Sequence, residues 1–204
     1  MPFEKVEQLA DADFPTRWGH FRILGFRATS AAATGVVPPP EEAVAVVMGD
    51  LHAAPPLVRV HSQSLTGDVF GSLRCDCRDQ LEMALEKIAE AGAGVLIYEQ
   101  KEGRGIGLLP KLRAYELQDQ GLDTVEANEQ LGFKADQREY GLPADILKAL
   151  GITQVKLLSN NPKKVEALEA AGVKVVERVS AEVAPRASFE NYLRVKREKM
   201  GHLR

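Results

Sequence analysis

The sequence predicts a layered α/β protein with a β-rich N-terminal half. Apolar, β-branched runs dominate residues 20–62, whereas from Asp76 onward segments with a helical period alternate with short apolar segments. Such alternation is typical of a sheet with largely parallel pairing that is covered by helices. The length of 204 residues suits one domain, and no repeat or linker divides it. We therefore expect residues 1–204 to form a single domain.

The N-terminal half carries three predicted strands, over residues 20–28, 42–51 and 56–62, where apolar residues alternate in part or form β-branched runs. The stretch TSAAATGVVPPPEE between the first two is predicted to be a mobile surface loop. Its three consecutive prolines, Pro38 to Pro40, exclude a helix or a central strand there.

The C-terminal half alternates helices and strands. A helix is expected over residues 79–92, where Leu81, Ala84, Leu85 and Ile88 share one face and Gly92 ends the period. Further helices are expected over residues 106–121, 142–151, 161–172 and 191–203. Asn160 or Asn161 would cap the helix that starts near Pro162. Strands are expected over residues 94–100, 154–160 and 173–180.

The composition and net charge argue against several classes of protein. The net charge of −3 provides no general field for nucleic acid or acidic membranes, so any anion site must be local. The start MPFEKVEQLADADFP is charged where a signal peptide needs an apolar run. No stretch approaches the roughly 20 apolar residues that span a bilayer. We expect a soluble cytoplasmic protein, in which two cysteines are a metal or reactive pair rather than a disulfide.

Those cysteines, Cys75 and Cys77, are one residue apart and could supply two thiolates to a zinc ion. A catalytic zinc site typically has three protein ligands and an open position for water. Nearby candidates for the third ligand are His61, Asp68 and Asp76, whereas the neutral hydroxyl of Ser64 is a poor ligand. The alternative is that both cysteines are small buried residues without a metal, which is commoner for an arbitrary pair at this spacing.

Three further segments are candidates for chemistry. In LLSNNPKKVEAL, a strand delivers Ser159 to a helix N-terminus that carries Lys164, an arrangement that favours a phosphate. YEQKEGRGIG places Glu102, Gly103 and Arg104 in a turn that is equally compatible with phosphate binding or with a tight strand-to-helix connection. KADQREYG places Asp136 and Arg138 two residues apart, which by itself predicts only a surface ion pair.

Taken together and in order, these segments resemble GTP cyclohydrolase II, the family that opens riboflavin biosynthesis. The matching stretches are RVHSQSLTGDVFGSLRCDCRDQLE, EQKEGRGIGLLPKLRAYELQDQG, DTVEANEQLGF, KADQRE, LLSNNPKKVEAL and KREKMGH, which span residues 59–202. The resemblance implies a mixed sheet between helical layers, a homodimer, and hydrolysis of GTP to a diaminopyrimidine ribosyl phosphate, formate and pyrophosphate. It also implies Zn²⁺ and, with the triphosphate, Mg²⁺.

The resemblance assigns roles residue by residue. GTP contacts map to Arg59, Val60, His61, Ser62, Gln63, Gln80, Glu102, Gly103, Arg104, Thr124, Ser159 and Lys164. Asp136 matches the proposed proton acceptor, Arg138 the arginine proposed to attack the α-phosphate, and Tyr115 a tyrosine implicated in ring opening. Because a guanidinium stays protonated in proteins, Arg138 could instead stabilise charge on the α-phosphate. Tyr115 also falls on an apolar helical stripe and could belong to the core.

The resemblance also locates the third zinc thiolate of the family, eleven positions before Cys75, where this chain has Ser64. Loss of one of three thiolates weakens zinc binding, because affinity depends on ligand number and charge. Ring opening is then expected to be slow or absent, whereas pyrophosphate release needs Mg²⁺, Arg138 and Lys164 rather than zinc. Two alternatives follow: a zinc-independent pyrophosphohydrolase that produces GMP, and a non-catalytic GTP-binding protein.

Overall fold

The computed structural model describes residues 3–30, 38–134, 136–184 and 186–203. By the clustering of its contacts the chain forms two compact units, each made of three separate segments. The first unit comprises Met1–His61, Met83–Gln100 and Glu139–Ala181, and the second comprises Ser62–Glu82, Lys101–Arg138 and Glu182–Arg204. The predicted single domain therefore has an internal division. Residues 31–37 of the predicted mobile loop lie outside the described residues.

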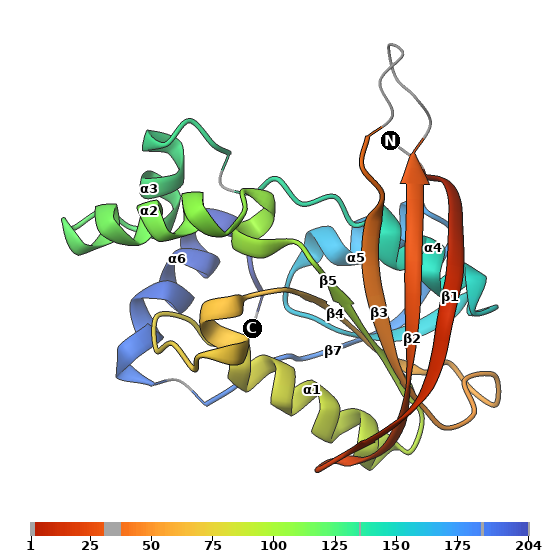
Figure 1. Ribbon diagram of the computed structural model, residues 1–204. Helices are drawn as coiled ribbons and strands as arrows, with labels where there is room; N and C mark the ends of the chain where they lie inside the picture. The colour runs from red at the N-terminus through yellow and green to blue at the C-terminus, as the bar shows by residue number, and fades with distance from the viewer. Residues whose placement is uncertain (1–2, 31–37, 135, 185, 204) are drawn as a thin grey trace. The chain divides into compact units, whose positions relative to one another are not determined.

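The first unit is built on a seven-stranded sheet in the order β1-β2-β3-β5-β4-β6-β7 (Figure 1). Its strands are β1 (Phe3–Thr16), β2 (Gly19–Ser30), β3 (Glu41–Met48), β4 (Leu57–Ser62), β5 (Gly94–Glu99), β6 (Gln154–Leu158) and β7 (Lys174–Val179). Strands β1, β2, β3 and β5 pair antiparallel, whereas β4, β6 and β7 pair parallel. The mixed α/β fold is confirmed, with antiparallel pairing in the N-terminal part of the sheet and parallel pairing of β4, β6 and β7.

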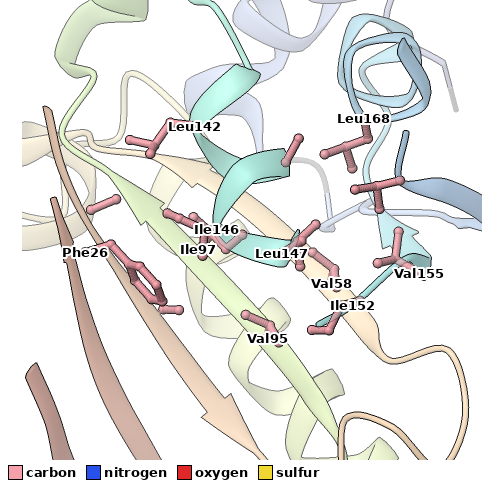
Figure 2. Packing of buried hydrophobic residues seen from close by; sticks show 14 of the residues in the cluster. Phe26, Val58, Val95, Ile97, Leu142, Ile146, Leu147, Ile152, Val155 and Leu168 are labelled. Atoms are coloured by element: carbon pink, nitrogen blue, oxygen red, sulfur yellow. The ribbon is translucent and has the colours of Figure 1, made fainter. Parts of the chain in front are cut away.

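Helices cover both faces of this sheet. On one face, α4 (Gly141–Ala149) and α5 (Pro162–Ala170) pack on alternate strand residues, so that Ile146 and Leu147 are buried with Ile97 (Figure 2). On the other face lies the second half of α1 (Cys77–Ala91). A β-carbon at Gly94 would come within 3.0 Å of Ile88, so the glycine lets this helix approach β5 closely. The first unit is therefore a three-layer arrangement.

The strand β1 is absent from the sequence-based prediction. Its residues are mostly exposed and many are charged, as in the pair of Asp11 with Arg22 of β2, where Oδ1 and Nη2 are 2.6 Å apart. Because β1 is an edge strand with a register shift between Gln8 and Ala10, it shows no alternation of buried and exposed residues. Pairing with the buried strand β2, rather than hydrophobic periodicity, determines its structure.

The second unit consists of helical segments. They are η1 (Leu65–Val69), the first six residues of α1, η2 (Glu102–Gly105), α2 (Leu108–Asp119), α3 (Thr124–Gln130), η3 (Ala187–Phe189) and α6 (Glu190–Met200). The predicted helices α2 and α6 are confirmed, whereas α3 is missing from the prediction although Asp123 and Glu126 form a capping box at its start. Within the described ranges, no helix is both long and apolar enough to cross a membrane.

Candidate functional site

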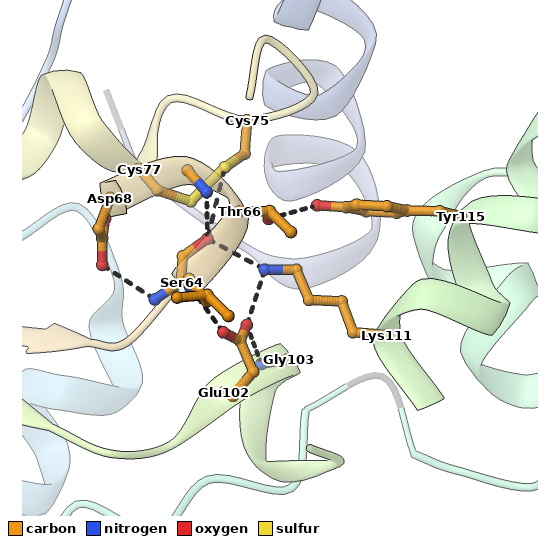
Figure 3. A network of polar contacts seen from close by, with 11 residues as sticks. Ser64, Thr66, Asp68, Cys75, Cys77, Glu102, Gly103, Lys111 and Tyr115 are labelled. Carbon is orange, nitrogen blue, oxygen red and sulfur yellow. Dashed lines mark hydrogen bonds and ion pairs between the residues drawn. A yellow bond between two sulfur atoms is a disulfide. The ribbon is translucent and has the colours of Figure 1, made fainter. Parts of the chain in front are cut away.

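Ser64 lies in a buried network of the second unit (Figure 3). It caps η1: its hydroxyl Oγ accepts a hydrogen bond from the Gly67 N–H at 3.3 Å, and its own N–H donates to Asp68 Oδ2 at 2.9 Å. The Lys111 ammonium donates to the same Oγ at 3.0 Å and to Glu102 Oε1 at 2.7 Å. The Lys111–Glu102 ion pair is largely shielded, with side chains 13% and 10% exposed.

The three positions that we predicted to match the zinc ligands of the family converge on Gly67. A β-carbon there would lie 3.0 Å from Cys75 Sγ, 3.0 Å from Ser64 Oγ and 2.8 Å from Cys77 Cβ. The glycine is therefore required for this close approach. The structure joins Cys75 and Cys77 by a disulfide, which contradicts the prediction that they are a metal or reactive pair rather than a disulfide. Their turn brings the two sulfurs together although one residue separates them.

As folded, these residues do not fit a three-ligand zinc site. A hydroxyl oxygen has two acceptor lone pairs, and those of Ser64 face Lys111 and the Gly67 N–H. The sulfurs of Cys75 and Cys77 are bonded to each other rather than present as thiolates. No cluster of three or more histidine, cysteine or acidic side chains suited to a metal occurs among the residues placed in the structure.

The other candidates for a third ligand make different contacts. Asp68 accepts the hydrogen bond from the Ser64 N–H, and Asp76 pairs with Lys196 at 2.8 Å. His61 belongs to the first unit, where its ring stacks on Tyr98 with centroids 5.4 Å apart.

The turn Glu102–Gly105 has an unusual backbone. Gly103 and Arg104 have φ of 61° each, in the left-handed region that side chains with a β-carbon rarely adopt. The strain at Arg104 costs about 1 kcal/mol. Buried Glu102 fixes the turn, because its carboxylate accepts hydrogen bonds from the N–H groups of Leu65 at 2.6 Å and Gly103 at 2.9 Å. These contacts therefore fix the backbone of the turn that carries Arg104.

Asp136 and Arg138 form a shielded pair, which corrects the prediction of a surface ion pair. Arg138 donates through Nε at 2.9 Å and Nη2 at 2.6 Å to the two carboxylate oxygens of Asp136, and through Nη1 to Ser62 Oγ at 3.3 Å. The side chains are only 12% and 5% exposed. Burial alone raises the pKa of Asp136, but the hydrogen bonds and charge of Arg138 outweigh it and hold that pKa below its usual value.

Four more predicted residues belong to the second unit, and two of them, Tyr115 and Gln80, contact neighbouring side chains. The Tyr115 hydroxyl lies 3.1 Å from Thr66 Oγ1, so Tyr115 is tied to η1 rather than buried as a core residue. Gln80 donates to Asp76 Oδ2, and Thr124 is the first residue of α3. Gln63, half-buried, lies between Ser62 and Ser64.

The predicted residues of the first unit gather around the end of β4. Arg59 Nη1 donates to the Leu158 carbonyl at 3.1 Å, and Lys164 Nζ donates to the carbonyl of buried Val60 at 2.7 Å. Lys164 is itself buried and lies over the ring of Tyr140, 5.4 Å from its centroid.

The turn before α5 carries the residues of the predicted anion site. The Ser159 hydroxyl accepts from the Asn161 N–H at 3.1 Å, and Asn161 caps α5 by accepting from the Lys163 N–H at 3.1 Å. Asn161 Nδ2 also donates to the Tyr140 hydroxyl at 3.3 Å. A hydroxyl, a helix N-terminus and a buried ammonium are thus near one another in the first unit, as an anion site requires.

Lys111, Tyr140, Tyr192 and Lys196 were not among the predicted site residues. A sequence signal was present for Lys111, which precedes Tyr115 by four positions and therefore shares its face of α2. Tyr140 follows the Asp136–Arg138 stretch by two positions, but its contacts with Asn161 and Lys164 join segments about twenty residues apart.

Comparison with known proteins gives consistent matches. The family model described as GTP cyclohydrolase II matches residues 7–180. Proteins named GTP cyclohydrolase-2 from Enterobacter sp. (strain 638) and Escherichia coli O9:H4 (strain HS) are each 54% identical over 200 residues, which cover 98% of this chain and 98% of each relative.

Among solved structures, RibBX, a two domain 3,4-dihydroxy-2-butanone 4-phosphate synthase from A. baumannii, matches with a TM-score of 0.52 and 24% identity. The match covers 88% of this chain and 41% of that chain, so this chain corresponds to less than half of the larger protein. At this identity the likeness shows the fold alone.

Proposed function

The chain belongs to the GTP cyclohydrolase II family, and on this premise we propose that it hydrolyses GTP to 2,5-diamino-6-hydroxy-4-(5-phosphoribosylamino)pyrimidine, formate and pyrophosphate, the first step of riboflavin biosynthesis. The shielded Asp136–Arg138 pair is the observation that carries the proposal, because its geometry suits the phosphate end of this reaction. The protein acts in the cytoplasm as a homodimer, with Mg²⁺ bound to the triphosphate.

At the phosphate end, Arg138 acts as a charge stabiliser. Its Nε and Nη2 are held by Asp136 and its Nη1 points to Ser62, so the guanidinium is fixed and stays charged. A preorganised cation stabilises negative charge that develops on the α-phosphate without reorganising during the reaction. Asp136 orients the guanidinium and, as a carboxylate, accepts the proton of an attacking water. In the first unit, the buried ammonium of Lys164 and the buried hydroxyl of Ser159 are proposed phosphate contacts.

At the base end, Glu102, Gly103 and Arg104 bind the guanine, and the Tyr115 hydroxyl acts in ring opening. Zinc is the metal that the family implies, but the disulfide and the occupied Ser64 hydroxyl do not fit it as folded. We therefore assign no step to zinc. Pyrophosphate release then outpaces ring opening in this chain.

The products formed from GTP test this proposal. The reduced chain is incubated with GTP and Mg²⁺, with and without Zn²⁺, and the products are separated by chromatography. We expect pyrophosphate together with formate and the ring-opened pyrimidine, the latter two forming more slowly. GMP and pyrophosphate alone would identify a pyrophosphohydrolase instead, and GTP binding without turnover would identify a non-catalytic protein. Analytical ultracentrifugation checks the homodimer, and a clean monomer would contradict it.

A further inference from the structure

Three side chains of α6 contact three different segments of the second unit. They are Tyr192, Lys196 and Lys199, which are four and three residues apart and therefore share one face of the helix. Each contacts a segment that carries a proposed GTP contact.

Lys196 neutralises a buried carboxylate. Its Nζ lies 2.8 Å from Asp76 Oδ1, and the two side chains are 13% and 1% exposed. The other carboxylate oxygen of Asp76 accepts a hydrogen bond from the Gln80 side-chain amide. A charge as buried as that of Asp76 requires a nearby counter-ion, so Lys196 keeps in place the carboxylate that orients Gln80.

Tyr192 holds Arg104. Its hydroxyl shares a hydrogen bond with Arg104, whose guanidinium carbon lies 5.7 Å from the centre of the Tyr192 ring, and Lys196 Nζ lies 4.4 Å from the same centre. Burial raises the pKa of Tyr192, but the positive charges of Lys196 and Arg104 outweigh it and lower that pKa overall. Because an arginine side chain has several rotatable bonds, that of Arg104 depends on such contacts to keep one orientation.

Lys199 contacts the start of α3. Its ammonium pairs with Asp123 and, at 3.0 Å, with Glu126. These two residues form the capping box of α3, and Thr124 lies between them. This ion pair is more exposed than that of Lys196, so it stabilises the fold less.

We propose that Lys196 and Tyr192 are positioning residues of the GTP site, which set the directions of Gln80 and Arg104 from α6. This proposal rests on the proposed function, since it takes Gln80 and Arg104 to contact GTP. It makes the last helix part of the binding machinery, although none of its residues is assigned to GTP by the resemblance.

Steady-state kinetics of matched variants tests the role of Lys196. Lys196→Met should raise KM for GTP about tenfold or more, because it removes the ammonium that pairs with buried Asp76, with kcat changed less than about twofold. Lys196→Arg keeps the charge and should restore most of the affinity. Arg197→Met removes a cation from the exposed side of the same helix and should leave KM unchanged.

Tyr192→Phe supplies a second test with little risk to folding, since only the hydroxyl is removed. It should raise KM about tenfold, as expected for one hydrogen bond to a charged group. An unchanged KM in folded Lys196→Met and Tyr192→Phe would overturn the proposal, as would equal losses in Lys196→Met and Arg197→Met.

Calorimetric titration with GTP and Mg²⁺ separates this proposal from the proposed function. If the wild-type chain binds GTP without turnover, the proposed function fails. The Kd for GTP must then still be raised in Lys196→Met and Tyr192→Phe and unchanged in Arg197→Met. If the wild-type chain turns GTP over and Kd is the same in all variants, only the positioning role fails. A wild-type chain that bound no GTP would overturn both proposals.

Discussion

The Lys111 ammonium lies 3.0 Å from the Ser64 hydroxyl oxygen, at the position predicted to match the family's third zinc thiolate. A thiolate there would attract the ammonium as a counter-ion, whereas the neutral hydroxyl only accepts a hydrogen bond. The same ammonium neutralises Glu102, so one cation connects the Ser64 position with the turn proposed to bind guanine.

Ser64→Cys should create a zinc site. Under reducing conditions the added thiolate joins Cys75 and Cys77 around Gly67, and we expect zinc content to rise to about one ion per chain, as in three-ligand sites. Formate release should increase in parallel. Mass spectrometry of the metal content checks the first expectation and chromatography the second.

Ser188→Cys is the control for this variant, because it adds an exposed thiol on η3, in a different segment of the second unit. Equal zinc uptake by both variants would show that the position of the thiol is irrelevant. Full zinc loading of Ser64→Cys without faster formate release would place the defect elsewhere in the chain.

Lys111→Met should destabilise the fold. It leaves the carboxylate of Glu102 buried without its ion-pair partner, and breaking such a pair costs about 3 kcal/mol in the free energy of unfolding. Urea denaturation measures the loss. Lys148→Met is the matched control, because Lys148 pairs with Asp145 on the surface and should cost less than about 1 kcal/mol. Similar losses for both variants would contradict a special role for the buried pair.

Arg138→Lys should slow GTP hydrolysis with little change in affinity. Lysine keeps the charge but loses the planar fork that binds both oxygens of Asp136, and we expect kcat to fall about 100-fold, as for loss of a preorganised donor. Stopped assays measure kcat, and calorimetry measures the Kd of GTP.

A separate rapid-quench experiment distinguishes a charge stabiliser from a covalent nucleophile at Arg138. With Arg138 as a stabiliser, rapid quenching of the wild-type chain should trap no phosphoguanosine–protein adduct. Accumulation of that adduct on Arg138 would reverse this assignment.

The stability of the fold should depend on pH through Asp136. Since its pKa is lowered in the folded chain from the usual value of 3.8, the ionised carboxylate stabilises the fold above that value. This contribution should be lost as the pH falls through the lowered pKa. Urea denaturation of the wild-type chain and of Asp136→Asn checks this: the difference in unfolding free energy should be constant from pH 7 to about pH 5 and shrink below about pH 4. A difference independent of pH would contradict it.

Most helices and strands could be predicted from local patterns, because their buried residues recur with the period of the element. The helix α1 buries Ala84, Leu85 and Ile88, the spacing that the sequence shows. The strand β1 lacks such a pattern, since an edge strand with few buried residues obtains its structure from pairing with β2. The helix α3 was predictable, because Asp123 and Glu126 have the capping-box spacing.

The candidate site was less predictable where contacts join distant segments. The motif identified Asp136 and Arg138, but their burial depends on surroundings that a spacing of two residues does not contain. The contact of Lys111 with Ser64 spans 47 positions, and that of Lys196 with Asp76 spans 120. No local pattern encodes either contact. The disulfide was missed because a pair at this spacing rarely closes, and the turn that closes it is a tertiary feature.

The parallel pairing of β4 with β6 has a consequence for synthesis of the chain. Leu57 pairs with Lys156, so the ribosome must add roughly 100 residues after β4 before its partner strand exists. At elongation rates of about 5 to 20 residues per second this takes roughly 5 to 20 s. During that interval one edge of β4 is open to other nascent chains, and the apolar residues Val58 and Val60 lack their final cover. Chaperone dependence and aggregation during rapid expression should therefore be greatest for variants in which synthesis of the segment between β4 and β6 takes longer.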